Sequence, residues 1–341
     1  MPKCGSQCFL CDYPVRFDTY EGCSHACEYC FAKKFQDISK IKNGESYQSL
    51  KNFIEGKRVN ETNWCDWNIP IHWGGMSDPF QPVEKTRKNS LKCLELLKQT
   101  QYPFIVSTKG KLIIEEPYKT LLSECNCVLQ ISAVCSSYDK IELGCPTYEE
   151  RVKIASIMSK QVKRVIIRIQ PYMHEVFQEV YDNLEKLADA GVYGVIIEGM
   201  KYKNKKAGLV KVAGDFTYHY EVIKSDFLKL KARAHELGLK IYSGENRLRI
   251  FGDSLSCCGT DGLDGFKPNK FNLNHLLNGD KQFPTELQKK ECTGGCFRSL
   301  VQSTDKARPL MKQSFAYNML DTYKKNSKKI DETFGIDKRR R

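Results

Sequence analysis

The sequence predicts an α/β protein in which parallel strands alternate with helices. Short runs rich in apolar and β-branched residues recur through the middle of the chain, and segments with helical spacing lie between them. Strand–helix units in series favour parallel strands joined by right-handed crossovers. This order is typical of a doubly wound sheet and also of a complete or partial (β/α) barrel, and the pattern alone does not choose between them.

The predicted strands are short, and several are apolar on both faces, as buried parallel strands are. They are Val15–Tyr20, Ile69–Trp73, Pro103–Thr108, Val128–Ser132, Val165–Gln170, Gly194–Glu198 and Lys240–Ser243. In either fold, the chemistry is expected at the carboxyl ends of these strands.

Helices are predicted in the intervals between the strands. They are Glu84–Lys98, Glu115–Glu124, Thr147–Lys160, His174–Ala190 and Tyr220–Leu237, and a further helix begins near Glu28. Within one of them, Val176, Val180, Leu184 and Leu187 follow helical spacing. Gly191 and Gly238 stand where left-handed residues end helices.

The composition indicates a chain with a substantial apolar core. Of 341 residues, 41% are hydrophobic and 28% are charged, which excludes a disordered, collagen-like or small disulfide-bonded chain. No stretch approaches the ~18–20 apolar residues that a membrane span needs, and the first residues lack the apolar centre of a signal peptide. We therefore expect a soluble, cytoplasmic protein without membrane contact.

The chain divides into four predicted segments. Residues 1–12 form a cysteine-rich N-terminal segment, and residues 13–243 form the strand–helix region. In residues 244–310, glycines and cysteines recur and regular periodicity is weak, so we expect an appended cysteine-rich extension. Residues 311–341 are predicted as a helix and a basic tail.

The formal net charge of +13 is concentrated in two places. One is the basic tail, for which a solvated terminus is the alternative explanation. The other is a lysine-rich segment that directly follows the predicted strand ending at Glu198. Its lysines are Lys201, Lys203, Lys205, Lys206 and Lys211. Lysines clustered at the carboxyl end of a strand are compatible with a solvated loop and with a surface that binds an anionic substrate such as nucleic acid.

Sixteen cysteines in a chain without a secretion signal indicate metal ligands rather than disulfides. Cys23, Cys27 and Cys30 are separated by three and two residues. Three thiolates so close together can hold three irons of a cubane cluster and leave the fourth iron open to a small molecule. A structural zinc site usually takes four ligands, with paired cysteines two residues apart, so this spacing fits zinc poorly.

This stretch, with Tyr29 directly before its last cysteine, resembles the cysteine loop of radical S-adenosylmethionine (SAM) enzymes. It also follows the first predicted strand, where that family places its loop. The resemblance implies a 4Fe-4S cluster on Cys23, Cys27 and Cys30 whose open iron binds SAM. In such enzymes the reduced cluster cleaves SAM to a 5′-deoxyadenosyl radical, and a reducing partner such as flavodoxin or ferredoxin supplies the electron.

A second set of motifs narrows the resemblance to the spore photoproduct lyase-like group of that superfamily. Met76–Glu84 is similar to the S/T-D-P-x-x-P-x-E run of the group, Ser107–Lys109 to the end of its third strand, and Ile131–Ser132 to the end of its fourth. Glu142–Pro146, followed by Arg151, resembles its E-P…R stretch. The resemblance implies a partial (β/α)6-type TIM barrel with a cysteine-rich C-terminal extension.

The resemblance covers about residues 13 to 200 and also implies which residues hold SAM. The candidates are Ser77, Asp78, Lys109, Ser132, Gly74 and Gly75. A lysine can pair with the methionyl carboxylate, hydroxyls and a carboxylate can hold the nucleoside, and glycines let the backbone approach a ligand closely. Asp78 is alternatively a turn residue before Pro79, and Glu142 and Arg151 are alternatively a structural ion pair.

The lyase group has a hydrogen-donating cysteine directly before the S/T-D pair, where this chain has Met76. A thioether has no S–H bond to offer a substrate radical, so we do not expect the photoproduct repair reaction itself. Cys135 and Cys145 follow the fourth strand of the motif series and are candidate catalytic hydrogen donors from another direction. The alternative is that both are small buried hydrophobic residues.

A second cysteine triad with the same spacing lies near the N-terminus, at Cys4, Cys8 and Cys11. It has no strand before it, so it is not the SAM loop of the barrel. We expect it to join a cysteine of the extension in an auxiliary iron–sulfur cluster or a zinc site. The candidates are Cys257, Cys258, Cys292 and Cys296, which are alternatively a four-ligand site of their own.

Together these features predict a radical SAM enzyme that abstracts hydrogen from an anionic substrate, either nucleic acid or nucleotide. Radical modification of a peptide or a small metabolite is the alternative within the same chemistry. A non-catalytic, nucleic-acid-binding metalloprotein with two structural cysteine sites is the alternative from a different class.

Overall fold

The computed structural model describes residues 2–4, 10–57, 69–212, 215–269, 272, 274 and 275. Its main feature is an eight-stranded sheet with the order β1-β2-β5-β6-β7-β8-β9-β12. The strands are β1 Lys3–Cys4, β2 Val15–Phe17, β5 Ile71–Trp73, β6 Phe104–Thr108, β7 Cys127–Ser132, β8 Arg164–Tyr172, β9 Gly194–Gly199 and β12 Lys240–Ser243. The strands from β2 to β12 pair in parallel, and β1 pairs antiparallel with β2.

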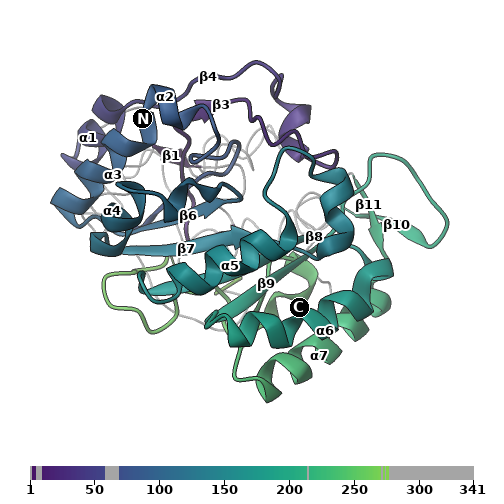
Figure 1. The fold of residues 1–341 in the computed structure, drawn as a ribbon. Helices are drawn as coiled ribbons and strands as arrows, with labels where there is room; N and C mark the ends of the chain where they lie inside the picture. Colours follow the sequence, from purple (N-terminus) through teal and green to yellow (C-terminus); the bar gives the residue numbers. More distant parts are fainter. Residues whose placement is uncertain are drawn as a thin grey trace, which may run out of the picture.

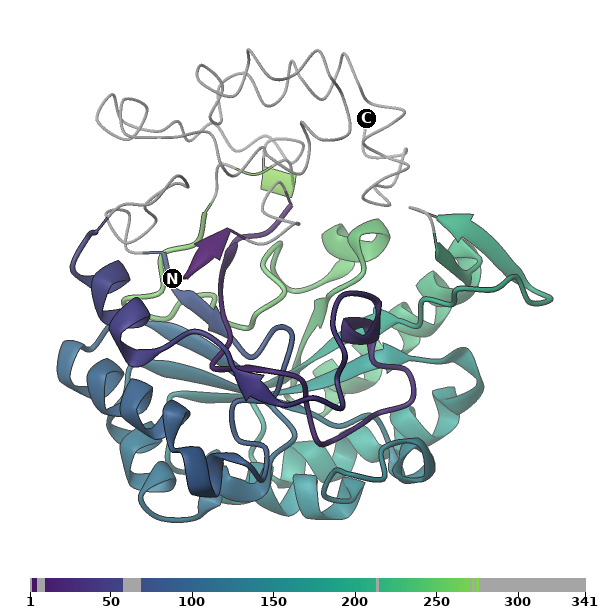
Figure 2. The same ribbon diagram turned by 90° about the horizontal axis from the view of Figure 1, so that it is seen from above.

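The order of the strands distinguishes between the two predicted architectures. From β2 to β12 each strand of this sheet lies beside the strand of the same sheet that follows it in the sequence. A doubly wound sheet instead reverses its order at a switch point. Figure 2 shows the strands curving into an arc with helices along its outer side. No pairing joins β1 to β12 in the part of the chain that the structure describes, so the sheet is an open, partial TIM-type barrel.

Helices follow the strands and cover the outer face of the sheet (Figure 1). They are α1 Tyr47–Ile54, α2 Glu84–Arg87, α3 Asn89–Thr100, α4 Tyr118–Glu124, α5 Tyr148–Met158, α6 Phe177–Asp189 and α7 Tyr220–Glu236. Short 3-10 helices are Phe31–Lys34, Lys111–Ile114, Ser136–Ile141, His174–Val176 and Asn246–Phe251. Within the described residues no helix is long and apolar enough to cross a membrane.

Two small antiparallel pairs lie outside the main sheet. They are β3 Tyr20–Glu21 with β4 Lys42–Asn43, and β10 Leu209–Val212 with β11 Asp215–Tyr218. The second pair is a hairpin that projects from the body of the molecule (Figure 1). The predicted helix and basic tail at residues 311–341 lie outside the described residues.

The inner face of the barrel changes character along its strands. Successive side chains of a strand point to opposite faces, so Leu129 of β7 packs against the helices while Val128 and Gln130 point inward. Near the amino ends an apolar cluster fills the interior; it comprises Tyr13, Ile105, Val128, Ile166, Ile196, Tyr242, Cys258 and Phe266. Closer to the carboxyl ends the inward residues are polar, as Gln130 and Arg168 are. The barrel is therefore packed at one end and polar at the other.

The predicted helix Glu84–Lys98 is two helices, because the chain turns at Lys88. Lys88 has a left-handed φ of 52° and separates α2 from α3. The buried carboxylate of Glu84 accepts hydrogen bonds from the backbone N–H groups of Ser90 at 3.0 Å and Leu91 at 2.8 Å. It thus satisfies donors in the first turn of α3, which otherwise lack partners.

The predicted helix near Glu28 is wrong. Only the 3-10 helix Phe31–Lys34 forms there. The backbone before it is committed to other partners, since the N–H of Glu28 donates to the carbonyl of Ile141 at 3.0 Å. A long-range contact therefore overrides the local helical preference.

Candidate functional site

Cys23, Cys27 and Cys30 lie on the loop between β3 and the 3-10 helix Phe31–Lys34. We call this loop the cysteine loop. The N–H of Cys23 donates to the carbonyl of Ile38 at 2.9 Å, and that of Cys30 donates to Cys27 at 3.2 Å. Cys27 is buried, and the other two thiols are partly exposed. The loop follows the carboxyl end of β2, so the three thiols lie at the edge of the sheet where the sequence predicts the chemistry.

Gln81 holds the start of the cysteine loop. Its side-chain oxygen accepts a hydrogen bond from the N–H of Ser24 at 2.9 Å, and its amide donates to the carbonyl of Gly22 at 3.2 Å. Gln81 is fully buried. One neutral amide thus matches two backbone groups and fixes the start of the loop. Sequence reasoning missed this residue, although it lies inside the Met76–Glu84 run.

Asp78 links the cysteine loop to β6. One carboxylate oxygen lies 3.1 Å from Nε2 of His25, and the same oxygen accepts the N–H of Lys109 at 2.6 Å. The other accepts the hydroxyl of Thr108 at 2.7 Å and the N–H of Phe80 at 2.8 Å. Burial opposes ionisation, but His25 and the other donors outweigh it and hold the pKa of Asp78 below its usual value. The carboxylate positions His25, and its contact with SAM stays a prediction.

Ser77, Gly74 and Gly75 lie near Asp78 in the sequence but differ in how much space they leave for a ligand. The hydroxyl of Ser77 donates to the carbonyl of Tyr20 at 2.7 Å. Gly74 has a φ of 86°, and a Cβ there would lie 2.4 Å from the carbonyl oxygen of Ser107, so only glycine fits against β6. A Cβ at Gly75 would make ordinary contacts at 3.7 Å. Gly75 is therefore the glycine beside which a ligand finds most room.

Lys109, Glu142 and Arg151 form an ion-pair network beside Tyr29. The carboxylate of Glu142 lies 2.6 Å from Nη2 of Arg151 and 3.5 Å from Nζ of Lys109. The Tyr29 hydroxyl donates to the same carboxylate, and Nζ of Lys109 lies 5.4 Å from the centre of the Tyr29 ring. Burial raises the pKa of Glu142 to about 7, and Arg151 opposes this shift. The Lys109 side chain remains 15% exposed, so its ammonium can also meet an anionic ligand.

The two candidate donor thiols lie in different surroundings. Sγ of Cys145 lies 3.6 Å from Sγ of Cys27, so this thiol borders the cysteine loop. Cys135 is fully buried in the apolar core, and burial, together with the neighbouring Glu179, raises its pKa to about 12. The structure brings Cys145, and not Cys135, to the triad. A donor role for either residue stays a prediction.

The donor set of the cysteine loop suits an iron–sulfur cluster. Three thiols a few residues apart match the three protein ligands of a cubane with one open iron. Between them, the hydroxyl of Ser24 is buried and has no hydrogen-bond partner among the described residues. Within those residues, no three His, Cys, Asp or Glu side chains are arranged to hold a single metal ion.

A layer of polar side chains crosses the inner face of the barrel. Arg16 bonds to Nδ1 of His72, whose Nε2 lies 3.1 Å from the hydroxyl of Ser107. The guanidinium of Arg168 donates to the same hydroxyl at 2.9 Å. Burial and the two guanidinium groups lower the pKa of His72 well below its usual value, so the imidazole is neutral. Sequence reasoning missed this layer, although single polar residues at inward positions of apolar strands, such as Gln130, are its signal.

Thiols of the N-terminal segment and of the cysteine-rich extension lie beside this layer. The guanidinium of Arg16 donates to Sγ of Cys11 at 3.7 Å, and the sulfurs of Cys257 and Cys258 are 3.9 Å apart. The hydrogen bond from Cys258 lowers the pKa of Cys257 to about 5; burial opposes this shift and the adjacent Arg249 adds to it. Of the predicted metal ligands, Cys4, Cys8, Cys292 and Cys296 have side chains that lie outside the described residues.

Hydrogen bonds join the N-terminal segment to the extension. The carbonyl of Asp12 accepts the N–H of Asn269 at 2.7 Å. Its carboxylate accepts the amide of Asn272 at 2.8 Å and lies 3.0 Å from Nε2 of His275. Asn274 donates to the carbonyl of Leu10 at 2.9 Å. The fold thus brings described parts of both cysteine-rich ends together, and a metal site between them stays a prediction.

The lysine-rich segment forms an exposed loop between β9 and β10. Nζ of Lys201 lies 2.6 Å from a carboxylate oxygen of Glu198, so its charge is compensated. Lys203, Lys205 and Lys206 are exposed. The loop follows the carboxyl end of β9, as the sequence predicts, and leads into the projecting hairpin.

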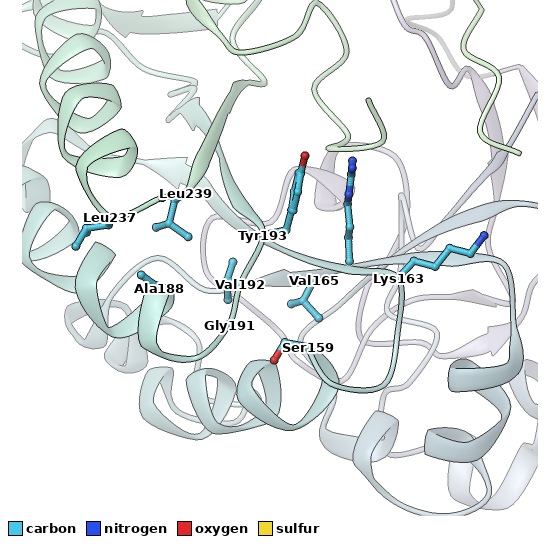
Figure 3. Close-up of a pocket in the computed structure, with 11 residues that line it drawn as sticks. Ser159, Lys163, Val165, Ala188, Gly191, Val192, Tyr193, Leu237 and Leu239 are labelled. Carbon is cyan, nitrogen blue, oxygen red and sulfur yellow. The ribbon is translucent and has the colours of Figure 1, made fainter. Parts of the chain in front are cut away.

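A hollow of about 350 Å³ lies at the opposite end of the barrel (Figure 3). It is lined by residues of helix-to-strand loops, among them Ser159, Gly191, Val192, Tyr193 and Gly238. Residues at the amino ends of barrel strands serve stability rather than chemistry. None of the predicted site residues lines this hollow.

No protein-family model matches the chain. Solved structures with a similar fold include a spore photoproduct lyase mutant with dinucleoside spore photoproduct, at 13% sequence identity and a TM-score of 0.54, covering 68% of this chain and 77% of the lyase. A second lyase mutant, with bound AdoMet and the same dinucleoside, gives 15% identity and a TM-score of 0.54 over 68% and 76% of the two chains. SuiB of Streptococcus suis bound to S-adenosylmethionine gives 10% identity and a TM-score of 0.50 over 70% and 52%.

Among curated proteins, uncharacterized proteins of Mycobacterium bovis and Mycobacterium tuberculosis are similar to this chain. Each is 22% identical over 211 residues, which are 57% of this chain and 62% of the relative. The chain thus spans about six-tenths of the length of the curated relatives that it matches.

At 10 to 15% sequence identity, the likeness to these solved structures concerns the fold alone. They share the open parallel barrel, and the triad of Cys23, Cys27 and Cys30 follows its first parallel strand. This chain has the fold of spore photoproduct lyase.

Proposed function

We propose that this chain is a radical SAM enzyme that binds a 4Fe-4S cluster through Cys23, Cys27 and Cys30, cleaves SAM reductively and abstracts hydrogen from an anionic substrate. The observation that carries the proposal is the position of the three thiols, on one loop at the carboxyl ends of parallel strands in a chain with this fold. When bound, the reduced cluster supplies the electron that cleaves SAM to a 5′-deoxyadenosyl radical. Flavodoxin or ferredoxin is the proposed source of that electron.

The chain's own contribution begins with a rigid cysteine loop. Gln81 holds the backbone of the loop at two points, and Asp78 fixes the ring of His25. Loss of a residue that orients a metal ligand through a hydrogen bond typically lowers metal affinity about 10- to 100-fold. We therefore assign Gln81, Asp78 and His25 the role of positioning the three thiolates.

SAM is proposed to lie between the cysteine loop and the ends of β5, β6 and β7. The ammonium of Lys109 pairs with the methionyl carboxylate, as its partial exposure permits. Ser132 at the end of β7 is half-buried, and its hydroxyl makes no hydrogen bond to another described residue, so it can bond to the ligand. Gly75 leaves room for the ligand. Ser77, Asp78 and Gly74 complete the same site and contribute mainly its shape.

The proposed substrate is a nucleic acid or nucleotide. The exposed Lys203, Lys205 and Lys206 directly follow the carboxyl end of β9, on the same edge of the barrel as the cysteine loop. Lysines at this edge attract an anionic substrate toward the site. Lys201 contributes less, because Glu198 compensates its charge.

The second cysteine-rich region is proposed to bind an auxiliary iron–sulfur cluster, in preference to zinc. Cys11 and Cys257 lie near each other beside Arg16 and Arg249, and positive charges suit a metal bound by negative thiolates. The remaining ligands would come from the other cysteines of the two ends, which the sequence supplies in excess.

The test is release of 5′-deoxyadenosine from SAM by anaerobically reconstituted protein with dithionite. Wild-type protein is expected to release it, and the variant with Cys23, Cys27 and Cys30 all changed to Ala is expected to release none. Cys93→Ala, which removes a thiol from the buried face of α3, is the matched control and should behave as wild type. A protein that holds zinc and no iron, and that does not bind SAM, would instead be a non-catalytic metalloprotein.

A further inference from the structure

The segment from Ile141 to Cys145 packs directly against the cysteine loop. The carbonyl of Ile141 accepts the N–H of Glu28 at 3.0 Å, and the carbonyl of Gly144 lies 2.8 Å from Nδ1 of His25. A Cβ at Gly144 would lie 2.4 Å from the carbonyl oxygen of Ser24. Only glycine therefore allows the two backbones to approach so closely, and the segment forms one wall of the triad.

This wall carries a fourth thiol to the triad. Sγ of Cys145 lies 3.6 Å from Sγ of Cys27, within the distance of an S–H···S hydrogen bond. The N–H of Cys145 donates to the carbonyl of Glu142 at 2.8 Å, and Arg151 holds the Glu142 carboxylate at 2.6 Å. The position of the thiol is thus fixed by a buried ion pair.

The direction of this hydrogen bond follows from the chemistry of the ligand. A cysteine that binds iron is a thiolate and has no proton to donate. Cys145 is then the donor and Cys27 the acceptor. Hydrogen bonds to the sulfurs of an iron–sulfur cluster help to set its reduction potential, because they stabilise the extra electron of the reduced state.

We propose that the Cys145 thiol donates a hydrogen bond to the Cys27 thiolate and raises the reduction potential of the cluster. This inference rests on the proposed function, which assigns the cluster to Cys23, Cys27 and Cys30. Cys145 is thus a positioning and tuning residue. It differs from a hydrogen donor, which must reach the substrate radical, and from a side chain that only fills the apolar core.

The experiment is a redox titration of the reconstituted protein without SAM, followed by electron paramagnetic resonance. In Cys145→Ala the potential is expected to fall, so that at a fixed solution potential the ratio of reduced to oxidised cluster drops about tenfold, or about 59 mV for one electron. Cys145→Ser keeps a donor and is expected to restore most of the wild-type potential. Cys135→Ala removes a thiol from the same strand-to-helix connection and is expected to leave the potential unchanged.

Two outcomes would overturn the inference. One is a wild-type potential in Cys145→Ala, and the other is an equal fall in the Ala and Ser variants. Each variant is first assayed for iron. If Cys145→Ala binds fewer iron atoms than wild type, Cys145→Val takes its place, because its apolar side chain leaves no cavity and has no donor. The proposed function fails separately, if wild-type protein binds no cluster or releases no 5′-deoxyadenosine.

Discussion

The molecule has two cysteine triads of identical spacing, and their described members lie in different surroundings. Cys23, Cys27 and Cys30 lie at the carboxyl ends of the strands, on a loop that a buried carboxylate–histidine pair holds. Cys11 lies before the first parallel strand, beside guanidinium groups that line the barrel interior. A spacing therefore indicates which metals a triad can hold, while its place relative to the strands decides what a bound metal can do.

The two regions nevertheless share one feature, a buried carboxylate paired with a histidine. Asp78 pairs with His25 on the cysteine loop, and Asp12 pairs with His275 where the N-terminal segment meets the extension. Both carboxylates are buried and accept further hydrogen bonds from the protein. The symmetry makes matched substitutions possible, in which each region is the control for the other.

The largest effect is expected from removing one thiol of each triad. Cys27→Ala should abolish SAM cleavage, because a cluster with two protein ligands is not held. Cys11→Ala should keep the cluster of the cysteine loop and lose only metal bound elsewhere. The measurements are iron content per chain and release of 5′-deoxyadenosine. Loss of SAM cleavage in Cys11→Ala, with wild-type cleavage in Cys27→Ala, would reverse the assignment of the two triads.

The carboxylate–histidine pairs should affect metal binding less strongly, and each only in its own region. Asp78→Asn is expected to weaken iron binding at the cysteine loop by about 10- to 100-fold, the usual cost of losing a partner that orients a ligand. Asp12→Asn should spare that iron. Competition with a chelator, monitored by absorbance, measures the effect. Equal iron loss in both variants would mean that the pairs support the fold as a whole.

The exposed lysine loop lies outside both cysteine regions and is expected to govern substrate affinity alone. Changing Lys203, Lys205 and Lys206 to Gln should reduce the slope of log Kd against log salt concentration for a single-stranded oligonucleotide by about 2, since each lost phosphate contact contributes roughly 0.7. Filter binding at several salt concentrations measures the slope. The control changes three exposed lysines elsewhere, Lys92, Lys153 and Lys160. An identical slope in both triple variants would argue for a peptide or another uncharged substrate.

The smallest effect is expected from Asp18, which accepts the N–H groups of Met76 and Ser77. Burial raises its pKa to about 7, and these donors oppose the shift. Between about pH 4, where the unfolded carboxyl ionises, and pH 7, the folded state retains a proton that the unfolded state has lost. Stability should therefore fall as the pH rises through this window, by at most about 1.4 kcal/mol per pH unit.

Asp18→Asn should remove this dependence, because an amide does not titrate. Urea unfolding of wild type and variant at several pH values measures it. A slope that is the same in both proteins would show that Asp18 ionises at its ordinary pH in the folded state.

The sequence determined the class of fold and the spacing of the proposed cluster ligands. The strands and most helices follow from the alternation of apolar runs and helical spacing, which depends on local geometry alone. The spacing of Cys23, Cys27 and Cys30 is likewise local, because all three thiols lie on one loop. For Glu142 and Arg151 the sequence leaves two interpretations open, a role in the site and a structural ion pair. The structure contains the ion pair.

Only the tertiary structure decided which distant groups meet. The division of the predicted helix at Lys88 depends on the carboxylate of Glu84, and the 3-10 helix after the cysteine loop follows a backbone contact with Ile141. The approach of Cys145 to Cys27, and of Cys11 to Cys257, joins segments that no local pattern connects. A pattern along the chain records which face each side chain takes, whereas the curvature and register of the whole sheet set which faces come together.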